Sequence, residues 1–200
     1  PQSTQNNPPQ FRLPKDSALV PWLPMDEYSR LLPAPRKFPS SKNGNGLKQL
    51  ADYVHDLGLK FGLHVMRGIP RQAVWAETSI KGAPGIDASM IADTSSTCSW
   101  LNTMYGVDMD AEGSQQYYNS LFELYASWGV DYIKLDDALK KPYHEREIEA
   151  VKKAIKNSGR PMVLSLSPGI ENFKKADHVS QYGDLWRISG DFWDEWPRLK

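Results

Sequence analysis

Residues 128–136 read Trp-Gly-Val-Asp-Tyr-Ile-Lys-Leu-Asp, and this stretch decides the fold. Its middle, 130–135, is rich in Val, Tyr, Ile and Leu, which predicts a strand. The residues before it, 114–127, carry apolar side chains at three- and four-residue spacing, which predicts an amphipathic helix that ends at Gly129. A helix followed at once by a strand is one unit of an alternating α/β chain.

The same alternation continues on both sides of this stretch. The pattern predicts helices over 47–57, 143–157 and 170–176, and strands over 60–66, 161–166 and 184–188. Strand–helix–strand units of this length require a parallel sheet with covering helices. No Gly-x-Gly-x-x-Gly motif and no Walker-type phosphate loop follows any strand. We therefore predict a (β/α)8 TIM barrel, of which four strands can form only a part, since a full barrel needs about 250 residues.

Two segments interrupt this alternation. Nine of the 15 prolines lie within residues 1–40, where they disfavour long helices. We expect this stretch to be an irregular segment that packs on the barrel domain formed by 41–200, although a loose chain end is the alternative. Residues 67–110 lack a strong period, and so long a connection is more often functional than merely tolerated.

The composition excludes several classes of protein. The 24 Lys and Arg balance 24 Asp and Glu, so neither a nucleic acid nor an anionic membrane is an expected partner. No run reaches the roughly 18–20 apolar residues of a membrane span. The single cysteine, Cys98, excludes an internal disulfide framework and a Cys-based zinc site.

Polar or charged residues follow each predicted strand, where the active sites of such barrels lie. They are His64, Lys134, Asp136, Asp137, Ser167, Arg187 and Asp191. Two carboxyl groups across a small gap can act as nucleophile and general acid/base, and retaining glycoside hydrolysis needs such a pair about 5–5.5 Å apart. Asp136 and Asp191 are the candidates. Lys134, two residues before Asp136 on one face of the strand, would keep that carboxylate ionised.

Plainer roles stay open for several of these residues. Asp137 can be a helix N-cap or a turn former, His64 a core histidine, and Arg187 an ion-pair partner. Tryptophans near the strand ends, such as Trp100, can simply pack, or they can offer an apolar platform to the face of a sugar.

Three stretches resemble glycoside hydrolase family 27, which contains α-galactosidases and α-N-acetylgalactosaminidases. Residues 46–64, Gly-Leu-Lys-Gln-Leu-Ala-Asp-Tyr-Val-His-Asp-Leu-Gly-Leu-Lys-Phe-Gly-Leu-His, resemble its second helix and third strand. Residues 128–136 resemble its Trp-Gly-Val-Asp-x-x-Lys-x-Asp strand, and 186–191 its Trp-Arg-x-x-x-Asp element. The resemblance covers about 30–196 and implies that the chain holds approximately strands 3–6 of the barrel.

The resemblance also implies a role for each site residue. Asp136 falls on the catalytic nucleophile, Asp191 on the general acid/base, and Lys134 and Arg187 on side chains that hold sugar hydroxyls. The implied reaction is double displacement through a covalent glycosyl-enzyme, with no metal or organic cofactor. The remaining expected substrate-binding residues are His64, Ser167, Asp137 and Trp100.

The chain departs from the family pattern in several places. It has no Asp-Asp-Gly-Trp, and the usual tyrosine and aspartate of the third strand are replaced by His64 and 66–67. The cysteine after the nucleophile is Ala138, so the loop disulfide is not expected. Residues 166–168 are Leu-Ser-Pro where α-galactosidases commonly have Cys-Glu-Trp, and a serine there resembles the N-acetylgalactosaminidase-like members. Galactose is the first expected glycone, with N-acetylgalactosamine and arabinopyranose as alternatives.

The expected partner is an oligosaccharide or polysaccharide. Enzymes of this family usually meet exported polysaccharide, so a secreted or periplasmic location is favoured, although no signal peptide is visible in this chain. One alternative is a non-catalytic carbohydrate-binding or incomplete barrel relative. Another is a metal-dependent hydrolase using His64, Asp136, Asp137 and Asp191, disfavoured because the four histidines show no metal-binding spacing.

Overall fold

A four-stranded parallel sheet forms the centre of the chain. The structure is a computed structural model, and it describes residues 10–12, 19–21, 23–169, 173–191 and 196. The strands of the sheet, hydrogen-bonded in this order, are β3 (Gly62–Met66), β7 (Tyr132–Asp136), β8 (Val163–Leu166) and β9 (Leu185–Trp186). Parallel strands in sequential order, with helices in the connections, are the predicted arrangement of part of a (β/α)8 barrel.

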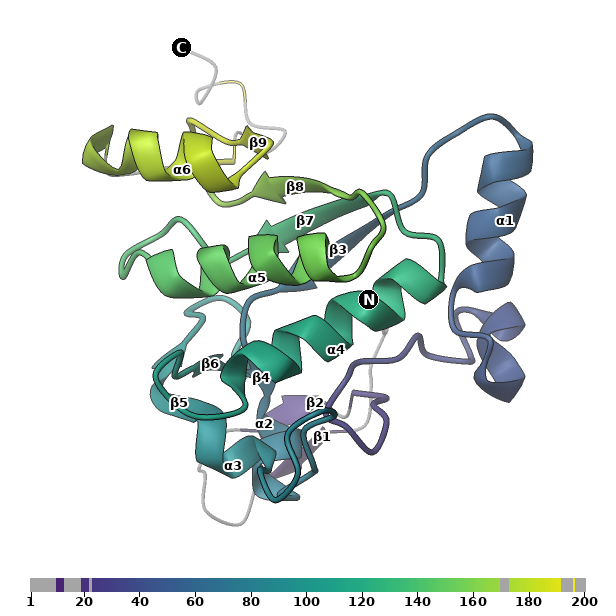
Figure 1. Cartoon of the computed structure of the whole chain (residues 1–200), viewed down its shortest axis with the longest axis horizontal. Coiled ribbons are helices and arrows are strands. Elements are labelled where there is room, and N and C mark those ends of the chain that lie inside the picture. Colours follow the sequence, from purple (N-terminus) through teal and green to yellow (C-terminus); the bar gives the residue numbers. More distant parts are fainter. Residues whose placement is uncertain (1–9, 13–18, 22, 170–172, 192–195, 197–200) are drawn as a thin grey trace.

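The longer helices precede β3 or lie in the connections between the parallel strands. They are α1 (Lys48–Asp56), α4 (Ser114–Ser127), α5 (Glu145–Asn157) and α6 (Ala176–Tyr182). Figure 1 shows α4 and α5 packed side by side on one face of the strands. None of the described helices has the length and apolar character that crossing a membrane requires.

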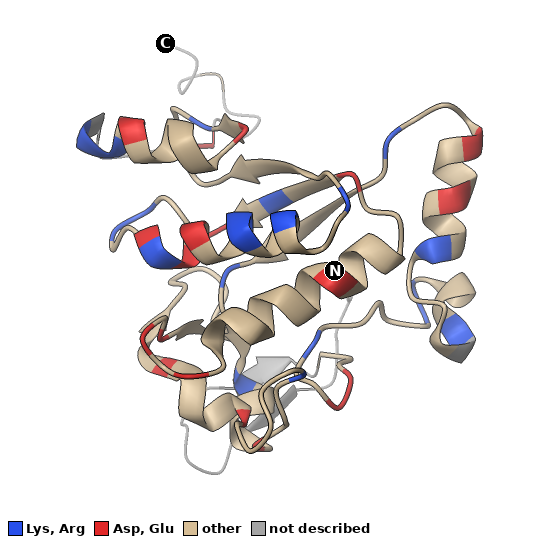
Figure 2. Cartoon of the chain, in the orientation of Figure 1, with Lys and Arg blue, Asp and Glu red and all other residues tan. Residues whose placement is uncertain are grey.

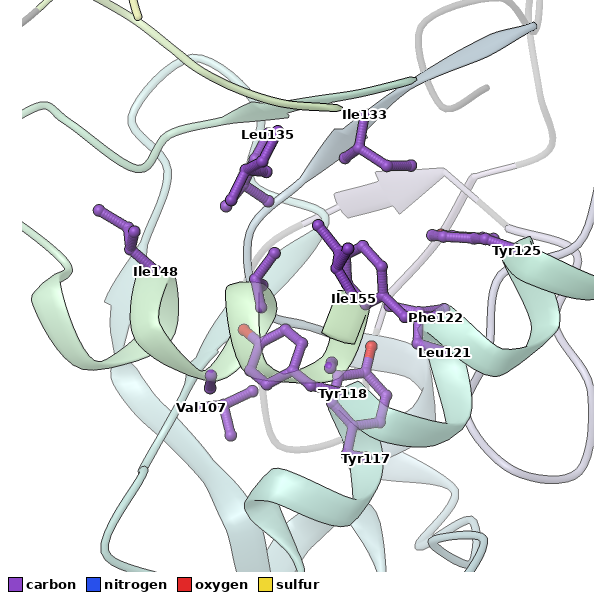
Figure 3. Close-up of a cluster of buried hydrophobic side chains, with 14 of the residues drawn as sticks. Val107, Tyr117, Tyr118, Leu121, Phe122, Tyr125, Ile133, Leu135, Ile148 and Ile155 are labelled. Carbon is purple, nitrogen blue, oxygen red and sulfur yellow. The ribbon is translucent and has the colours of Figure 1, made fainter. Parts of the chain in front are cut away.

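The strand register decides which side chains reach the open face of the sheet. His64 pairs with Lys134, and Met66 pairs with Asp136. Because side chains alternate along a strand, residues such as Ile133 and Leu135 point to the helices and are buried (Figure 3). His64, Lys134 and Asp136 therefore share the opposite face.

The core lies between this sheet and helices α4 and α5. On α4 the spacing that predicted the helix places aromatic side chains inward, with Phe122 and Tyr125 rings 5.6 Å apart (Figure 3). Burying each such side chain contributes about 1.5–3 kcal/mol. Figure 2 shows that α5 carries both acidic and basic residues along its length, whereas α4 carries almost no charged residues. The prediction of a solvated helix with a narrow apolar stripe at 143–157 is confirmed for α5.

Asp131, inside the stretch that decides the fold, ties the amino ends of the strands together. Its carboxylate accepts hydrogen bonds from the Phe61 N–H at 2.9 Å and from Arg160 Nη2 at 2.7 Å, and it lies 2.7 Å from His55 Nε2. Arg160 also donates from Nε to the carbonyl of Val130 at 2.9 Å. Asp131 is therefore a structural residue at the end of the sheet remote from Asp136.

The connection over 67–110 is more ordered than its sequence indicates. It forms a three-stranded antiparallel sheet, β4 (Ile69–Pro70), β6 (Met104–Val107) and β5 (Ala92–Thr97), with two short helices, α2 (Arg71–Trp75) and α3 (Ala88–Ile91). Elements of two to six residues are too short to produce a measurable period, which is why the sequence did not predict them.

The first 40 residues also contain regular structure. Strands β1 (Gln10–Arg12) and β2 (Leu19–Pro21) pair antiparallel, and a 3-10 helix, η2, spans Pro39–Gly44. Two hydrogen bonds join Leu23 to the side chain of Gln72. The Leu23 N–H donates to Gln72 Oε1 at 2.9 Å, and Gln72 Nε2 donates to the Leu23 carbonyl at 2.5 Å. These two bonds attach the segment to α2. The division of the chain at residue 40 stays a proposal.

The helix predicted over 170–176 differs in position. Residues 170–172 lie outside the described part, a 3-10 helix (η3) covers Phe173–Lys175, and α6 continues to Tyr182. The buried Val179 anchors this continuation. The sequence prediction ended the helix too early, because α6 has a single buried contact position and no clear apolar stripe.

Candidate active site

A cavity of about 810 Å³ lies over the carboxyl ends of the parallel strands. Its lining includes six of the eight predicted site residues, namely His64, Trp100, Lys134, Asp136, Arg187 and Asp191. A volume of this size is typical of ligand sites, which usually measure about 300–1,000 Å³. The structure therefore gathers predicted site residues that lie up to 127 positions apart in sequence, from His64 to Asp191, around one cavity.

Asp136 is the last residue of β7, and both of its carboxylate oxygens are engaged. Oδ1 accepts a hydrogen bond from the backbone N–H of Asp137 at 3.0 Å, and Oδ2 lies 3.1 Å from Nε2 of His64. Burial by itself raises the pKa of Asp136. The His64 and Asp137 hydrogen bonds and the Lys134 charge outweigh burial and hold that pKa below its usual value. Asp136 is therefore an ionised carboxylate at neutral pH, as a nucleophile must be.

His64 and Lys134 stand beside each other on the same face as Asp136. The His64 side chain is 43% exposed and lines the cavity, so within the described part of the chain it is not packed as a core histidine. The strand register produces this pairing, since residues at matching positions of β3 and β7 project side by side. The predicted effect of Lys134 on Asp136 is present, because its charge lowers the pKa of that carboxyl.

A second carboxylate comes from the segment after β9. Asp191 is 53% exposed, and its Oδ1 lies 2.8 Å from Arg187 Nη1. Arg187 also donates from Nη2 to the carbonyl of Ser189 at 3.1 Å, which fixes the turn between the two residues. The ion-pair role considered for Arg187 is thus present, and both side chains line the cavity.

Trp100 forms an aromatic part of the cavity wall. It lies in the loop between β5 and β6, is 45% exposed, and has Lys140 Nζ 5.0 Å from its ring centroid. A cation over an aromatic face is attracted by the ring quadrupole. Lys140, four residues after the predicted nucleophile, was not predicted as a site residue. Its position in the loop directly after β7 was the available signal.

Comparisons with known proteins identify the family of the chain. A family model described as alpha galactosidase A (Melibiase_2) matches residues 102–200. A crystal structure of a family 27 β-L-arabinopyranosidase from Geobacillus stearothermophilus is 54% identical with a TM-score of 0.86, covering 89% of this chain and 41% of that one. The chain belongs to glycoside hydrolase family 27.

Other relatives of this family 27 chain carry different names. The α-galactosidase of Coffea arabica is 31% identical over 175 residues, which are 87% of this chain and 35% of the relative. A putative α-N-acetylgalactosaminidase from Bacillus halodurans is 53% identical with a TM-score of 0.76, covering 89% of this chain and 40% of that one. The chain thus spans about a third of the length of the curated relatives it matches.

Two predicted substrate-binding residues of this family 27 chain lie outside the cavity lining. Asp137 is buried and pairs with Arg67, whose Nη2 lies 2.8 Å from its Oδ2. Ser167 is 1% exposed, and its Oγ has no hydrogen-bond partner among the described residues. Pro168 and Gly169, the residues that follow, line the cavity instead. The Asp137 side chain therefore forms an internal ion pair instead of facing the cavity, and the Ser167 side chain is too buried to face it.

The residues considered for a metal-dependent hydrolase do not form a ligand cluster in the described part of the chain. There, the group of acidic residues and histidine close enough to hold an ion is Glu145, Glu149 and His178, on α5 and α6. His178 already bonds with Tyr143 Oη at 2.6 Å and lies 3.1 Å from Glu149 Oε1. Since Lys175 also binds Glu145, we interpret this group as an ion-paired contact between helices.

Proposed function

We propose that the protein carrying this chain is a retaining glycosidase that hydrolyses terminal α-galactoside-type linkages. The observation that carries the proposal is Asp136, a carboxylate with a lowered pKa that lines the same cavity as the second carboxylate, Asp191. A neighbouring cation favours the charged form of a carboxyl group, and Lys134 supplies it for Asp136. The family relationship supports glycoside hydrolysis as the chemistry.

The proposed reaction is a double displacement. Asp136 attacks the anomeric carbon while Asp191 gives a proton to the leaving oxygen, so the glycosidic bond breaks and an ester to Asp136 forms. Asp191 then takes a proton from water, whose oxygen attacks the same carbon and releases Asp136. Two inversions leave the anomeric configuration of the product unchanged. Lys134 and Arg187 would bind sugar hydroxyls during both steps.

A second candidate concerns the sugar that is released. The relative named as a β-L-arabinopyranosidase is 54% identical to this chain, and the α-galactosidase of Coffea arabica is 31% identical. L-Arabinopyranose has the ring configuration of galactopyranose without its exocyclic hydroxymethyl group. One catalytic arrangement can therefore serve both, so a β-L-arabinopyranoside is the second candidate substrate. The N-acetylgalactosaminide alternative is supported by the 53% identity to a putative α-N-acetylgalactosaminidase, although Ser167, on which the sequence argument for it rested, does not line the cavity.

The test uses the full-length protein and three aryl glycosides: the α-D-galactopyranoside, the β-L-arabinopyranoside and the N-acetyl-α-D-galactosaminide. Asp136→Asn should lower kcat by about 10⁴-fold or more on whichever glycoside is cleaved. The control Asp177→Asn alters an exposed carboxylate on α6 and should leave kcat unchanged. NMR of the first product should show retained configuration. Hydrolysis that survives in Asp136→Asn, or an inverted first product, would refute the proposal.

Asp191 is tested separately through the leaving group. Asp191→Ala should slow hydrolysis strongly for poor leaving groups, such as a second sugar. It should affect dinitrophenyl glycosides little in the first step, since these leave without a proton. Equal losses on both substrates would argue against the acid role. Sugar binding by calorimetry without any turnover in the unaltered protein would instead support the non-catalytic alternative.

A further inference from the structure

A buried charged cluster lies directly behind Asp136. It contains Arg67, which follows β3 and is 4% exposed, with Asp137 after β7 and Glu147 in the first turn of α5. Arg67 Nη2 lies 2.8 Å from Asp137 Oδ2, and its Nη1 lies 2.7 Å from Glu147 Oε1. Tyr118 of α4 donates its hydroxyl proton to the other Glu147 oxygen. The cluster thus joins two strand ends to both helices that cover the sheet.

Arg67 makes three contacts with the two residues at the end of β7. Its backbone N–H donates to the carbonyl of Asp136 at 3.1 Å, and its Nε donates to the carbonyl of Asp137 at 3.1 Å. The third is the Nη2 contact with the Asp137 carboxylate. The planar guanidinium makes the two side-chain contacts in one fixed geometry, which a lysine cannot reproduce, whereas the backbone contact does not depend on the side chain.

Asp137 has a backbone conformation that needs this support. Its φ is +62°, in the left-handed region that non-glycine residues rarely adopt. Such a conformation persists only where the surrounding structure fixes it. In this conformation the Asp137 N–H donates to Oδ1 of Asp136 at 3.0 Å. The backbone of Asp137 therefore links Arg67 to the carboxylate that faces the cavity.

Stability alone does not account for the cluster. A buried ion pair often contributes no more to folding than well-packed apolar side chains of the same volume. The cluster is also tightly enclosed, because a Cβ added at Gly106 would lie 2.9 Å from Arg67 Nη1. Arg67 is thus closely confined on the side of Gly106, and the support of a catalytic group must be locked by such packing.

We propose that Arg67 is a positioning residue for the reaction: it holds Asp137 in the left-handed conformation that aims the Asp137 N–H at Asp136 Oδ1 and so orients the nucleophile. This inference rests on the proposed glycosidase function. It gives Asp137 a role through its backbone, in place of the direct substrate contact predicted from the sequence.

The first test is Arg67→Lys in the full-length protein. This substitution keeps the positive charge and removes the planar set of guanidinium N–H donors. We expect kcat to fall on the order of 10- to 100-fold with a much smaller change in KM. The acidic limb of the kcat/KM profile should move to higher pH, because a weaker Asp137 hydrogen bond favours protonated Asp136. Arg160→Lys is the matched control, since Arg160 holds residues 129–131 at the opposite end of β7. Arg160→Lys should lower Tm without shifting the acidic limb of the kcat/KM profile.

The second test separates positioning from the loss of a buried charge. In an Arg67→Met background, Asp137 and Glu147 both lose their ion-pair partner. Asp137→Gly and Asp137→Ala remove the same one of these two carboxylates, but only glycine adopts the left-handed conformation without a steric penalty. The glycine variant should recover part of kcat and the alanine variant should not. Equal recovery would overturn the proposal.

The titration of Asp136 can be followed by ¹³C NMR of its carboxyl carbon whether or not the protein turns over a substrate. If the unaltered protein lacks activity, the proposed function fails, and the upward shift of the Asp136 titration in Arg67→Lys still tests the positioning role. If Arg67→Lys leaves both the Asp136 titration and kcat unchanged in an active protein, the positioning role alone is overturned.

Discussion

Asp136 and His64 show how a strand register becomes chemistry at the scale of single residues. The two side chains meet because β3 and β7 pair in parallel with His64 beside Lys134. Nε2 of His64 then lies 3.1 Å from the Asp136 carboxylate and lowers its pKa. A lowered pKa keeps the proposed nucleophile charged as the pH falls, and we expect its contribution to activity to be lost only when the pH falls through that lowered value.

This pairing predicts the pH dependence of a histidine variant. His64→Phe keeps a ring of similar shape and removes the hydrogen bond, so the pKa of Asp136 should rise and the acidic limb of kcat/KM should move to higher pH. The control is His55→Phe, which removes a comparable histidine–aspartate contact, to Asp131, at the amino end of the strands. Rate profiles between pH 3 and 7 measure the shift. An identical limb in unaltered protein and His64→Phe would contradict the role of His64.

At the scale of elements, the amino ends of the strands are held by the ion pairs and hydrogen bonds of Asp131. Burial by itself raises the pKa of Asp131. The Phe61 N–H, His55 and Arg160 lower that pKa by more, and hold it below its usual value. These partners belong to α1, to the start of β3 and to the segment before β8. One carboxylate thus connects the elements around β7.

The pKa of Asp131 predicts how stability depends on pH. Asp131→Asn should cost about 1–3 kcal/mol at neutral pH, because hydrogen bonds to a charged group are lost. A depressed folded-state pKa stabilises above the unfolded value of about 3.9, and that contribution is lost as the pH falls through the folded value. The Tm difference between the unaltered protein and the variant should therefore shrink below about pH 4. A difference that stays constant down to pH 2 would contradict this.

The elements also show what the sequence can and cannot predict. Helix α4 and strand β7 follow from periodic apolar residues and Gly129, because burial on one face imposes a period. The antiparallel sheet in 67–110 does not, since its strands are held by tertiary contacts. In the site, Asp136 and Asp191 follow from their places after strands. The turn of Asp137 toward Arg67 depends on a positive φ, which the sequence of a non-glycine residue does not reveal.

At the scale of the whole molecule, the parallel sheet has two edge strands, β3 and β9. Among the described strands, β3 pairs only with β7, and β9 pairs only with β8. Side chains such as Val163, which is 40% exposed, lie on the face away from the helices. Unpaired strand edges beside apolar surface are sites of association.

The open edges predict the behaviour of these 200 residues produced alone. The chain should form oligomers whose mass, measured by light scattering after size-exclusion chromatography, rises with protein concentration. The full-length protein provides the comparison, and its mass should not depend on concentration in the same way. A monodisperse monomer of the 200-residue chain with a sharp unfolding transition would contradict the prediction.

Two arginines from neighbouring segments bind the residues at the two ends of β7, and this has a consequence for protein engineering. Arg160 holds 129–131 at one end, and Arg67 holds 136–137 at the other. Trp100 and Lys140 lie on the cavity wall and are not among the residues that these two arginines bind. Libraries that randomise those two positions should change which sugar is accepted while leaving the scaffold intact, so new specificities can be selected without a prior round of stabilisation.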